Sequence, residues 1–203
     1  MEMYLSRMLL NPLRKDVLAA IGDVYKLHKL VMSGFKGYDN NGRVLFRLEP
    51  EQRDGVVSLL IQSPVKPIWQ LPPDGLMHLQ TRKVSPEFPA GMLMPFRLRA
   101  NPVVTREGKR LGLVREDALR DWLLSRAESI GVEFMGLDVT DEGYSYGKQP
   151  KNNGKYRKLA FKAARFDGRM RVGDPELFVR KLVQGVGPGK GFGHGLLSVR
   201  YKR

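Results

Sequence analysis

Glycine occupies every second position from residue 185 to residue 195, and an apolar run at 196–199 follows. Glycine is required where the backbone takes a positive φ or lies flush against another molecule, and each glycine costs conformational entropy on folding. The stretch therefore predicts a tightly turning connection that ends in a strand. We expect it to hold a polyanion, and a flexible surface hairpin is the alternative.

Two nucleotide-binding motifs do not fit this glycine stretch. A Walker loop places four residues between its first glycine and a Gly-Lys-Ser or Gly-Lys-Thr triplet, but here the first position is Gln184 and Gly191 follows Lys190. A dinucleotide fingerprint requires a helix and a further strand after the glycines, and only eight residues follow Gly195. We expect neither kind of site.

The charge of the chain points to a nucleic-acid partner. The formal net charge is +14, and a folded domain tolerates such self-repulsion best when its partner supplies the counter-charge. Residues 148–171 hold nine Lys or Arg against Asp167 alone. An anionic membrane is the alternative, but a membrane-surface helix is disfavoured because this segment contains Pro150 and Gly154.

Composition disfavours several other classes. Apolar residues make up 42% of the chain, which suffices for folded cores. Cysteine is absent and only three histidines occur, so we expect no disulfide, no metal site and no cofactor. No stretch approaches 18 apolar residues, and charges interrupt the first apolar run too early for a signal peptide. The expected location is cytoplasmic, with no membrane partner.

Hydrophobic periodicity predicts a mixed order of elements in the first half of the chain. The expected strands span 3–10, 43–49, 56–62 and 77–84, and the expected helices span 14–21 and 24–32, the second capped by Asp23. Prolines between 63 and 75 leave room only for a weak helix. The order is β-α-β-β-(weak α)-β.

The second half repeats this order more clearly. The expected strands span 96–104, 132–139, 156–166, 169–172 and 196–201, with a basic turn at 105–110 and an Asp167-Gly168 hairpin turn. The expected helices span 115–129 and 175–183, the latter capped by Asp174. The predicted order of elements in the second half is β-α-β-β-α-β.

These orders predict an α+β protein of two tandem ferredoxin-like (RRM-like) βαββαβ modules, the first of them degenerate. Proline and glycine near residue 90 suggest domains at 1–90 and 91–203. The aromatic RNP signature of RNA-binding modules is absent, so base stacking on the sheet is not expected.

Four motifs occur in a fixed order along the chain: MYLSR at 3–7, VYKLH at 24–28, FRLRANP at 96–102, and GVGPGK at 185–190 with GLLSV at 195–199. The order and spacing of the four motifs together are far more specific than any one motif. In these motifs the chain resembles the CasE-type CRISPR-associated endoribonucleases of subtype I-E. The resemblance extends over nearly the whole chain.

The resemblance implies an enzyme that cuts CRISPR precursor RNA at the foot of each repeat hairpin. It implies cleavage without metal, and a product, the mature guide RNA, that stays bound among the other Cascade subunits. His28 matches the catalytic histidine of the family and Tyr25 matches its partner. Some relatives carry a lysine where this chain has Ser33, so either Lys29 or Lys36 could neutralise the scissile phosphate. The alternative function is a non-catalytic RNA-binding subunit.

The chemistry of RNA agrees with this assignment. A 2′-hydroxyl can attack the adjacent phosphorus to give a 2′,3′-cyclic phosphate and a 5′-hydroxyl when a side chain moves the protons, and histidine is suited to this near neutral pH. We expect catalysis by His28, Tyr25 and Lys29, and consider His194 a further RNA contact. The expected RNA-binding residues are Lys36, Lys148, Lys151, Lys155, Arg157, Lys158, Gly187, Gly189 and Lys190.

Overall fold

The computed structural model describes residues 2–38, 42–49, 55–69 and 76–200, which form two compact units. Unit 1 comprises Met1–Ser85, Ser145–Ala160 and Gly191–Gly193, and unit 2 comprises Pro86–Tyr144, Phe161–Lys190 and His194–Arg203. The chain therefore enters unit 1 three times. The expected division into folding domains at residue 90 stays a prediction.

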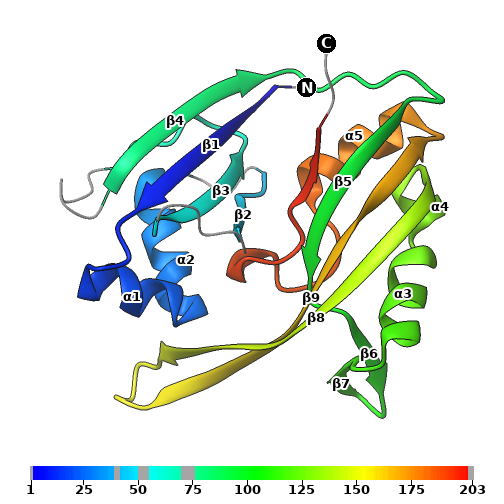
Figure 1. Ribbon diagram of the computed structural model, residues 1–203. Helices are drawn as coiled ribbons and strands as arrows, with labels where there is room; N and C mark the ends of the chain where they lie inside the picture. The colour runs from blue at the N-terminus through cyan, green and yellow to red at the C-terminus, as the bar shows by residue number, and fades with distance from the viewer. Residues whose placement is uncertain (1, 39–41, 50–54, 70–75, 201–203) are drawn as a thin grey trace. The chain divides into compact units, whose positions relative to one another are not determined.

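Unit 1 contains an antiparallel sheet with the strand order β2-β3-β1-β4, and its helices lie on one face of that sheet (Figure 1). Its elements are β1 (Met3–Leu10), α1 (Lys15–Ile21), α2 (Val24–Met32), the 3₁₀ turn η1 (Ser33–Phe35), β2 (Leu45–Leu48), β3 (Val57–Ser63) and β4 (Leu76–Val84). The described part of the β3–β4 connection, residues 64–69, contains no helix, which makes the module degenerate as predicted. Residues 50–54 and 70–75, where a turn and part of the weak helix were expected, lie outside the described residues.

The core of unit 1 lies between this sheet and helix α2. Leu27 and Val31 pack with Met8, Phe46 and Ile61, all of which are buried. Full burial of such a side chain contributes about 1.5–3 kcal/mol. This contact fixes which face of α2 remains outside the core.

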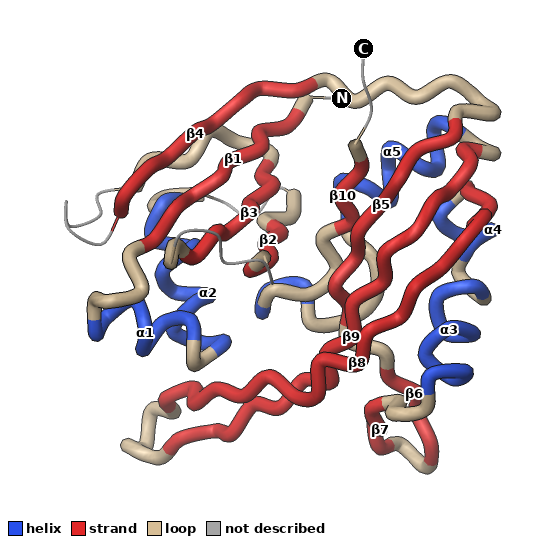
Figure 2. The backbone as a smooth tube through the Cα atoms, viewed as in Figure 1, coloured by secondary structure: helices blue, strands red, loops and turns tan. Residues whose placement is uncertain are grey.

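Unit 2 contains a second sheet, of order β10-β5-β9-β8, with its helices on one face (Figure 2). Its elements are β5 (Leu93–Ala100), β6 (Val103–Arg106), β7 (Lys109–Gly112), α3 (Glu116–Leu124), α4 (Ala127–Ile130), α5 (Pro175–Gln184) and β10 (Leu197–Val199). It also contains most of β8 (Val132–Pro150) and β9 (Tyr156–Val172), whose segments 145–150 and 156–160 belong to unit 1, and the first residue of the 3₁₀ turn η2 (Lys190–Phe192), whose other two residues belong to unit 1. When the strands of each sheet are numbered in chain order within their own module, both sheets have the strand order 4-1-3-2. The predicted pair of ferredoxin-like modules is therefore confirmed. No helix among the described residues is long and apolar enough to cross a membrane.

Two expected elements of unit 2 are each divided in the structure. The strand expected at 96–104 ends at Ala100, because Asn101 and Pro102 interrupt the ladder, and the expected basic turn at 105–110 belongs to a β6–β7 hairpin. Glu107 and Gly108 form its turn with positive φ. The helix expected at 115–129 breaks after Leu124 and resumes at Ala127.

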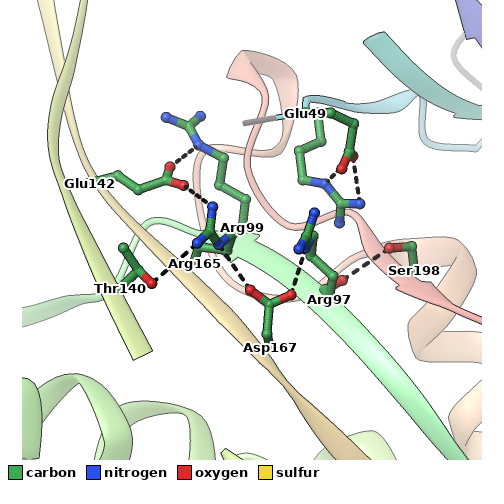
Figure 3. A network of polar contacts seen from close by, with 9 residues as sticks. Glu49, Arg97, Arg99, Thr140, Glu142, Arg165, Asp167 and Ser198 are labelled. Atoms are coloured by element: carbon green, nitrogen blue, oxygen red, sulfur yellow. Dashed lines mark hydrogen bonds and ion pairs between the residues drawn. The ribbon is translucent and has the colours of Figure 1, made fainter. Parts of the chain in front are cut away.

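The Asp167-Gly168 hairpin predicted from the sequence is wrong. Both residues lie within β9, opposite Arg97 and Phe96 of β5, and Gly168 does not take the positive φ that such a turn requires. Only glycine fits at position 168, because a Cβ there would lie 2.0 Å from the carbonyl oxygen of Gly136 on β8. The Asp167 carboxylate accepts from Arg97 at 2.6 Å and pairs with Arg165 at 2.9 Å (Figure 3). Asp167 thus links side chains along the sheet. Because no turn occurs at 167–168, β9 is continuous, and β8 and β9 form one long hairpin that turns at 151–155.

Candidate active site and RNA-binding surface

Helix α2 carries the three residues expected to act in catalysis. The Asp23 side chain caps the helix by accepting from the backbone N–H groups of Tyr25 and Lys26. The buried stripe of the helix consists of Val24, Leu27 and Val31. Tyr25 and His28 are half-buried beside that stripe, with ring centroids 6.4 Å apart, and Lys29 is exposed. The structure therefore places Tyr25 and His28 on one flank of α2, as predicted from their spacing.

Phe192 of the glycine stretch contacts the same histidine. The ring centroids of Phe192 and His28 are 5.5 Å apart, and both residues belong to unit 1. A Cβ built on Gly191 would lie 3.9 Å from His28 Nδ1. The sequence shows only that Phe192 stands between two glycines. That pattern does not predict a contact with His28, which is far away in the chain.

The basic residues expected at 148–158 lie at the tip of the β8–β9 hairpin. Lys148, Lys151, Lys155, Arg157 and Lys158 are all exposed, and none has an acidic partner among the residues that the structure describes. The turn is closed by the backbone N–H of Lys151, which donates to the carbonyl oxygen of Lys155 at 2.8 Å. This concentration of unpaired positive charge is suited to bind phosphates.

The remaining basic residues up to position 171 are mostly neutralised within the protein. The pairs are Lys162 with Asp141, Arg165 with Asp167 and Glu142, and Arg171 with Glu133. Lys162 is buried, and its ammonium group lowers the pKa of Asp141 through a hydrogen bond. The excess positive charge of segment 148–171 is therefore available mainly at the hairpin tip.

The glycine stretch owes its composition largely to packing within the protein. Gly187 and Gly189 both have positive φ, and a Cβ on Gly187 would lie 2.9 Å from the Trp122 ring. A Cβ on Gly189 would lie 3.2 Å from His194. These contacts explain both glycines without a ligand, so their expected contact with RNA, and that of the half-buried Lys190, stays a prediction.

The expectation that His194 contacts RNA is wrong. Its side chain is fully buried, and its ring centroid lies 5.6 Å from that of Phe161. Burial, with a smaller effect from the positive charge of Arg99, lowers the pKa of His194 to about 3. The residue is a neutral part of the core of unit 2.

Lys36, the alternative phosphate-neutralising residue, lies just beyond helix α2. It is exposed after η1 and lines an open pocket of about 470 Å³ together with Lys66 and Ile68. The backbone of this pocket is held by the N–H of Ile68, which donates to the carbonyl oxygen of Gly34 at 2.8 Å. Lys36 is thus displaced along the chain from Tyr25 and His28, whereas Lys29 lies on the same helix.

Known proteins match this chain over almost its full length. A sequence model described as CRISPR associated protein matches residues 3–201. The CRISPR-associated endoribonuclease Cse3 of Thermus thermophilus is 30% identical over 97% of this chain and 99% of its own. The chain belongs to this family of CRISPR-associated endoribonucleases.

One further relative and one solved structure support the assignment. The CRISPR system Cascade subunit CasE of Escherichia coli is 25% identical over 87% of this chain and 92% of its own. A structure of Thermus thermophilus Cse3 bound to an RNA representing a pre-cleavage complex has a TM-score of 0.86 and 27% identity, and it covers 99% of this chain and 100% of that one. The resemblance found in the sequence is confirmed.

Proposed function

We propose that this protein is a metal-independent endoribonuclease that cuts CRISPR precursor RNA at its repeat hairpins. The product, the mature guide RNA, remains bound, and the protein works in the cytoplasm among other Cascade subunits. The names of the relatives support an RNA-processing enzyme and a Cascade partner. The observation that carries the proposal is the pairing of Tyr25 and His28 on one flank of α2.

The reaction uses a nucleophile that the RNA itself supplies. The 2′-hydroxyl oxygen attacks the adjacent phosphorus, the bond from phosphorus to the 5′-oxygen breaks, and a 2′,3′-cyclic phosphate and a 5′-hydroxyl result. One proton leaves the 2′-hydroxyl and one reaches the 5′-oxygen. His28 performs at least one of these proton transfers. General acid or base catalysis of this kind increases the rate about 10²–10⁴-fold.

Tyr25 and a lysine complete the site. The Tyr25 hydroxyl orients the 2′-hydroxyl or the imidazole, and a cation stabilises the charge that develops on the phosphate. We assign this cation to Lys29, because it is exposed on the same helix as His28. Lys36 is the alternative and otherwise binds the RNA backbone.

RNA binding is assigned to the hairpin tip and the glycine stretch. The five exposed basic residues at 148–158 contact the phosphates of the stem. Gly187, Gly189 and Lys190 present backbone N–H groups and one positive charge to the RNA. Binding is expected to weaken with salt because each phosphate contact releases a counterion.

A cleavage assay with a repeat-hairpin RNA in excess EDTA tests the proposal. We expect a cyclic-phosphate end, detected by mass spectrometry, that disappears in His28→Ala while RNA binding is retained. His78→Ala, which changes an exposed histidine on β4, is the control and should cleave normally. Unchanged cleavage by His28→Ala would refute the site. Absence of cleavage of any hairpin RNA by the parent protein would favour a non-catalytic RNA-binding subunit.

A further inference from the structure

We propose that Phe192 is a positioning residue for His28, and that the turn at 191–192 leaves Nε2 as the ring nitrogen that exchanges protons with RNA. The inference rests on the proposed function, because it takes His28 as the group that moves protons. It gives the glycine stretch a role in the reaction in addition to its packing role in unit 2.

The two nitrogens of His28 lie in different surroundings. Nδ1 is enclosed by protein atoms and has no hydrogen-bond partner among the described residues, whereas Nε2 is not enclosed in this way. Gly191 lies beside Nδ1, with its Cβ position 3.9 Å away. A nitrogen enclosed by the protein cannot reach a 2′-hydroxyl or a 5′-oxygen, since proton transfer requires hydrogen-bond distance. Nε2 is the nitrogen that remains for the substrate.

Phe192 supplies the contact that holds the imidazole in this orientation. Its ring lies 5.5 Å from that of His28, centroid to centroid, at an interplanar angle of 46°. No described residue hydrogen-bonds to Nδ1, so ring contacts must orient the imidazole in place of the usual acceptor. Tyr25 supplies the second ring contact, at 6.4 Å. Removal of the Phe192 ring would leave the imidazole free to rotate and would admit water to Nδ1.

Substitution of Phe192 separates positioning from binding. We expect Phe192→Ala to lower kcat about tenfold, because misplaced catalytic groups cost about 10–100-fold, while the Kd for the hairpin RNA stays within about twofold. Phe192→Leu retains an apolar side chain of similar reach and should restore most of kcat. Phe134→Ala removes a half-buried aromatic side chain from β8 in unit 2 and should leave kcat unchanged. An unchanged kcat in Phe192→Ala would overturn the inference.

Gly191 offers a second test that does not depend on disrupted packing. It does not have a positive φ, and a Cβ there meets only Nδ1 at an ordinary contact distance, so a side chain is accommodated. In Gly191→Asp the carboxylate would accept a hydrogen bond from Nδ1 and favour the imidazolium. Gly191→Asn has the same shape without the charge and is the matched control.

The readout is the pH dependence of kcat for these two variants. Whether His28 acts as base or acid, we expect the Asp variant to shift the profile to higher pH by about one unit relative to the Asn variant. Superimposable profiles would overturn the assignment of Nε2. Failure of the parent protein to cleave would instead refute the proposed function. A parent that cleaves through His28 but is insensitive to these substitutions would refute this inference alone.

Discussion

Asp23 joins helix α2 to the β8–β9 hairpin, because its Oδ2 accepts the backbone N–H of Lys148 at 3.1 Å. Its other oxygen, Oδ1, accepts from the backbone N–H groups of Tyr25 at 2.8 Å and Lys26 at 3.1 Å. One carboxylate therefore fixes the start of the helix that carries His28 and a residue of the basic hairpin. The proposed catalytic and RNA-binding groups of unit 1 share this support.

Substitutions of Asp23 should separate its two roles. Asp23→Ala is expected to lower the free energy of unfolding by about 1 kcal/mol through removal of the cap. Asn also caps helices well, so Asp23→Asn should cost only a few tenths of a kcal/mol, but its NH₂ group cannot accept from Lys148. Hydrogen exchange should therefore show a faster Lys148 amide in Asp23→Asn. Asp174→Ala, which removes only the α5 cap to Leu177, should leave that amide unchanged; a protected Lys148 amide in Asp23→Asn would contradict the assignment.

Gly147 allows the hairpin to approach α2. A Cβ there would lie 2.8 Å from both Asp23 Oδ1 and Val24 Cγ2. We expect Gly147→Ala to destabilise the fold by about 1–3 kcal/mol, because backbone must move to relieve the overlap. Gly136→Ala on the same strand is the control, since a Cβ at Gly136 meets nothing within 4 Å. Chemical denaturation compares the two, and equal stabilities would refute the close approach.

The exposed basic residues of the hairpin should control the salt dependence of RNA binding. Lys151→Ala combined with Lys158→Ala is expected to reduce the slope of log Kd against log salt by about two, because each phosphate that the variant no longer binds lowers the slope by about one. Lys109→Ala with Arg110→Ala removes two exposed charges from β7, outside the hairpin, and serves as the control. A slope in the hairpin variant equal to that of the parent protein would show that these two residues do not bind the RNA. Fluorescence anisotropy at several salt concentrations provides the measurement.

Local sequence signals predicted most of the fold. Asp23 and Asp174 mark the starts of α2 and α5 through their capping side chains, and both helices begin where expected. The Asp167-Gly168 pair misled because a dipeptide typical of turns here serves long-range needs. Asp167 pairs with arginines of two strands, and Gly168 passes close to Gly136. Such tertiary contacts have no local signature.

The candidate site was predictable only in part for the same reason. The spacing of Tyr25 and His28 places them on one flank of a helix from local geometry alone. Phe192 joins them through a contact between segments far apart in the chain, which neither periodicity nor composition encodes. His194 was taken for an RNA contact because it lies among glycines, whereas its ring is buried and packs close to the backbone of Gly189.

His194 should make the stability of the protein sensitive to mild acid. Its pKa is about 3 in the folded state and 6.5 ordinarily, so the unfolded chain binds a proton between these values that the folded protein does not. The contribution of neutral His194 to the free energy of unfolding is therefore fully present above pH 6.5. It falls as the pH decreases towards 3, by at most about 1.4 kcal/mol per pH unit. His194→Leu, which places a side chain that cannot titrate in the same buried site, should flatten this slope, while His78→Ala, at an exposed position, should retain it. Urea denaturation between about pH 5 and 6.5, where most carboxylates stay ionised, provides the measurement. An equal slope in the parent and His194→Leu would show that His194 can take up a proton in the folded state, contrary to its burial.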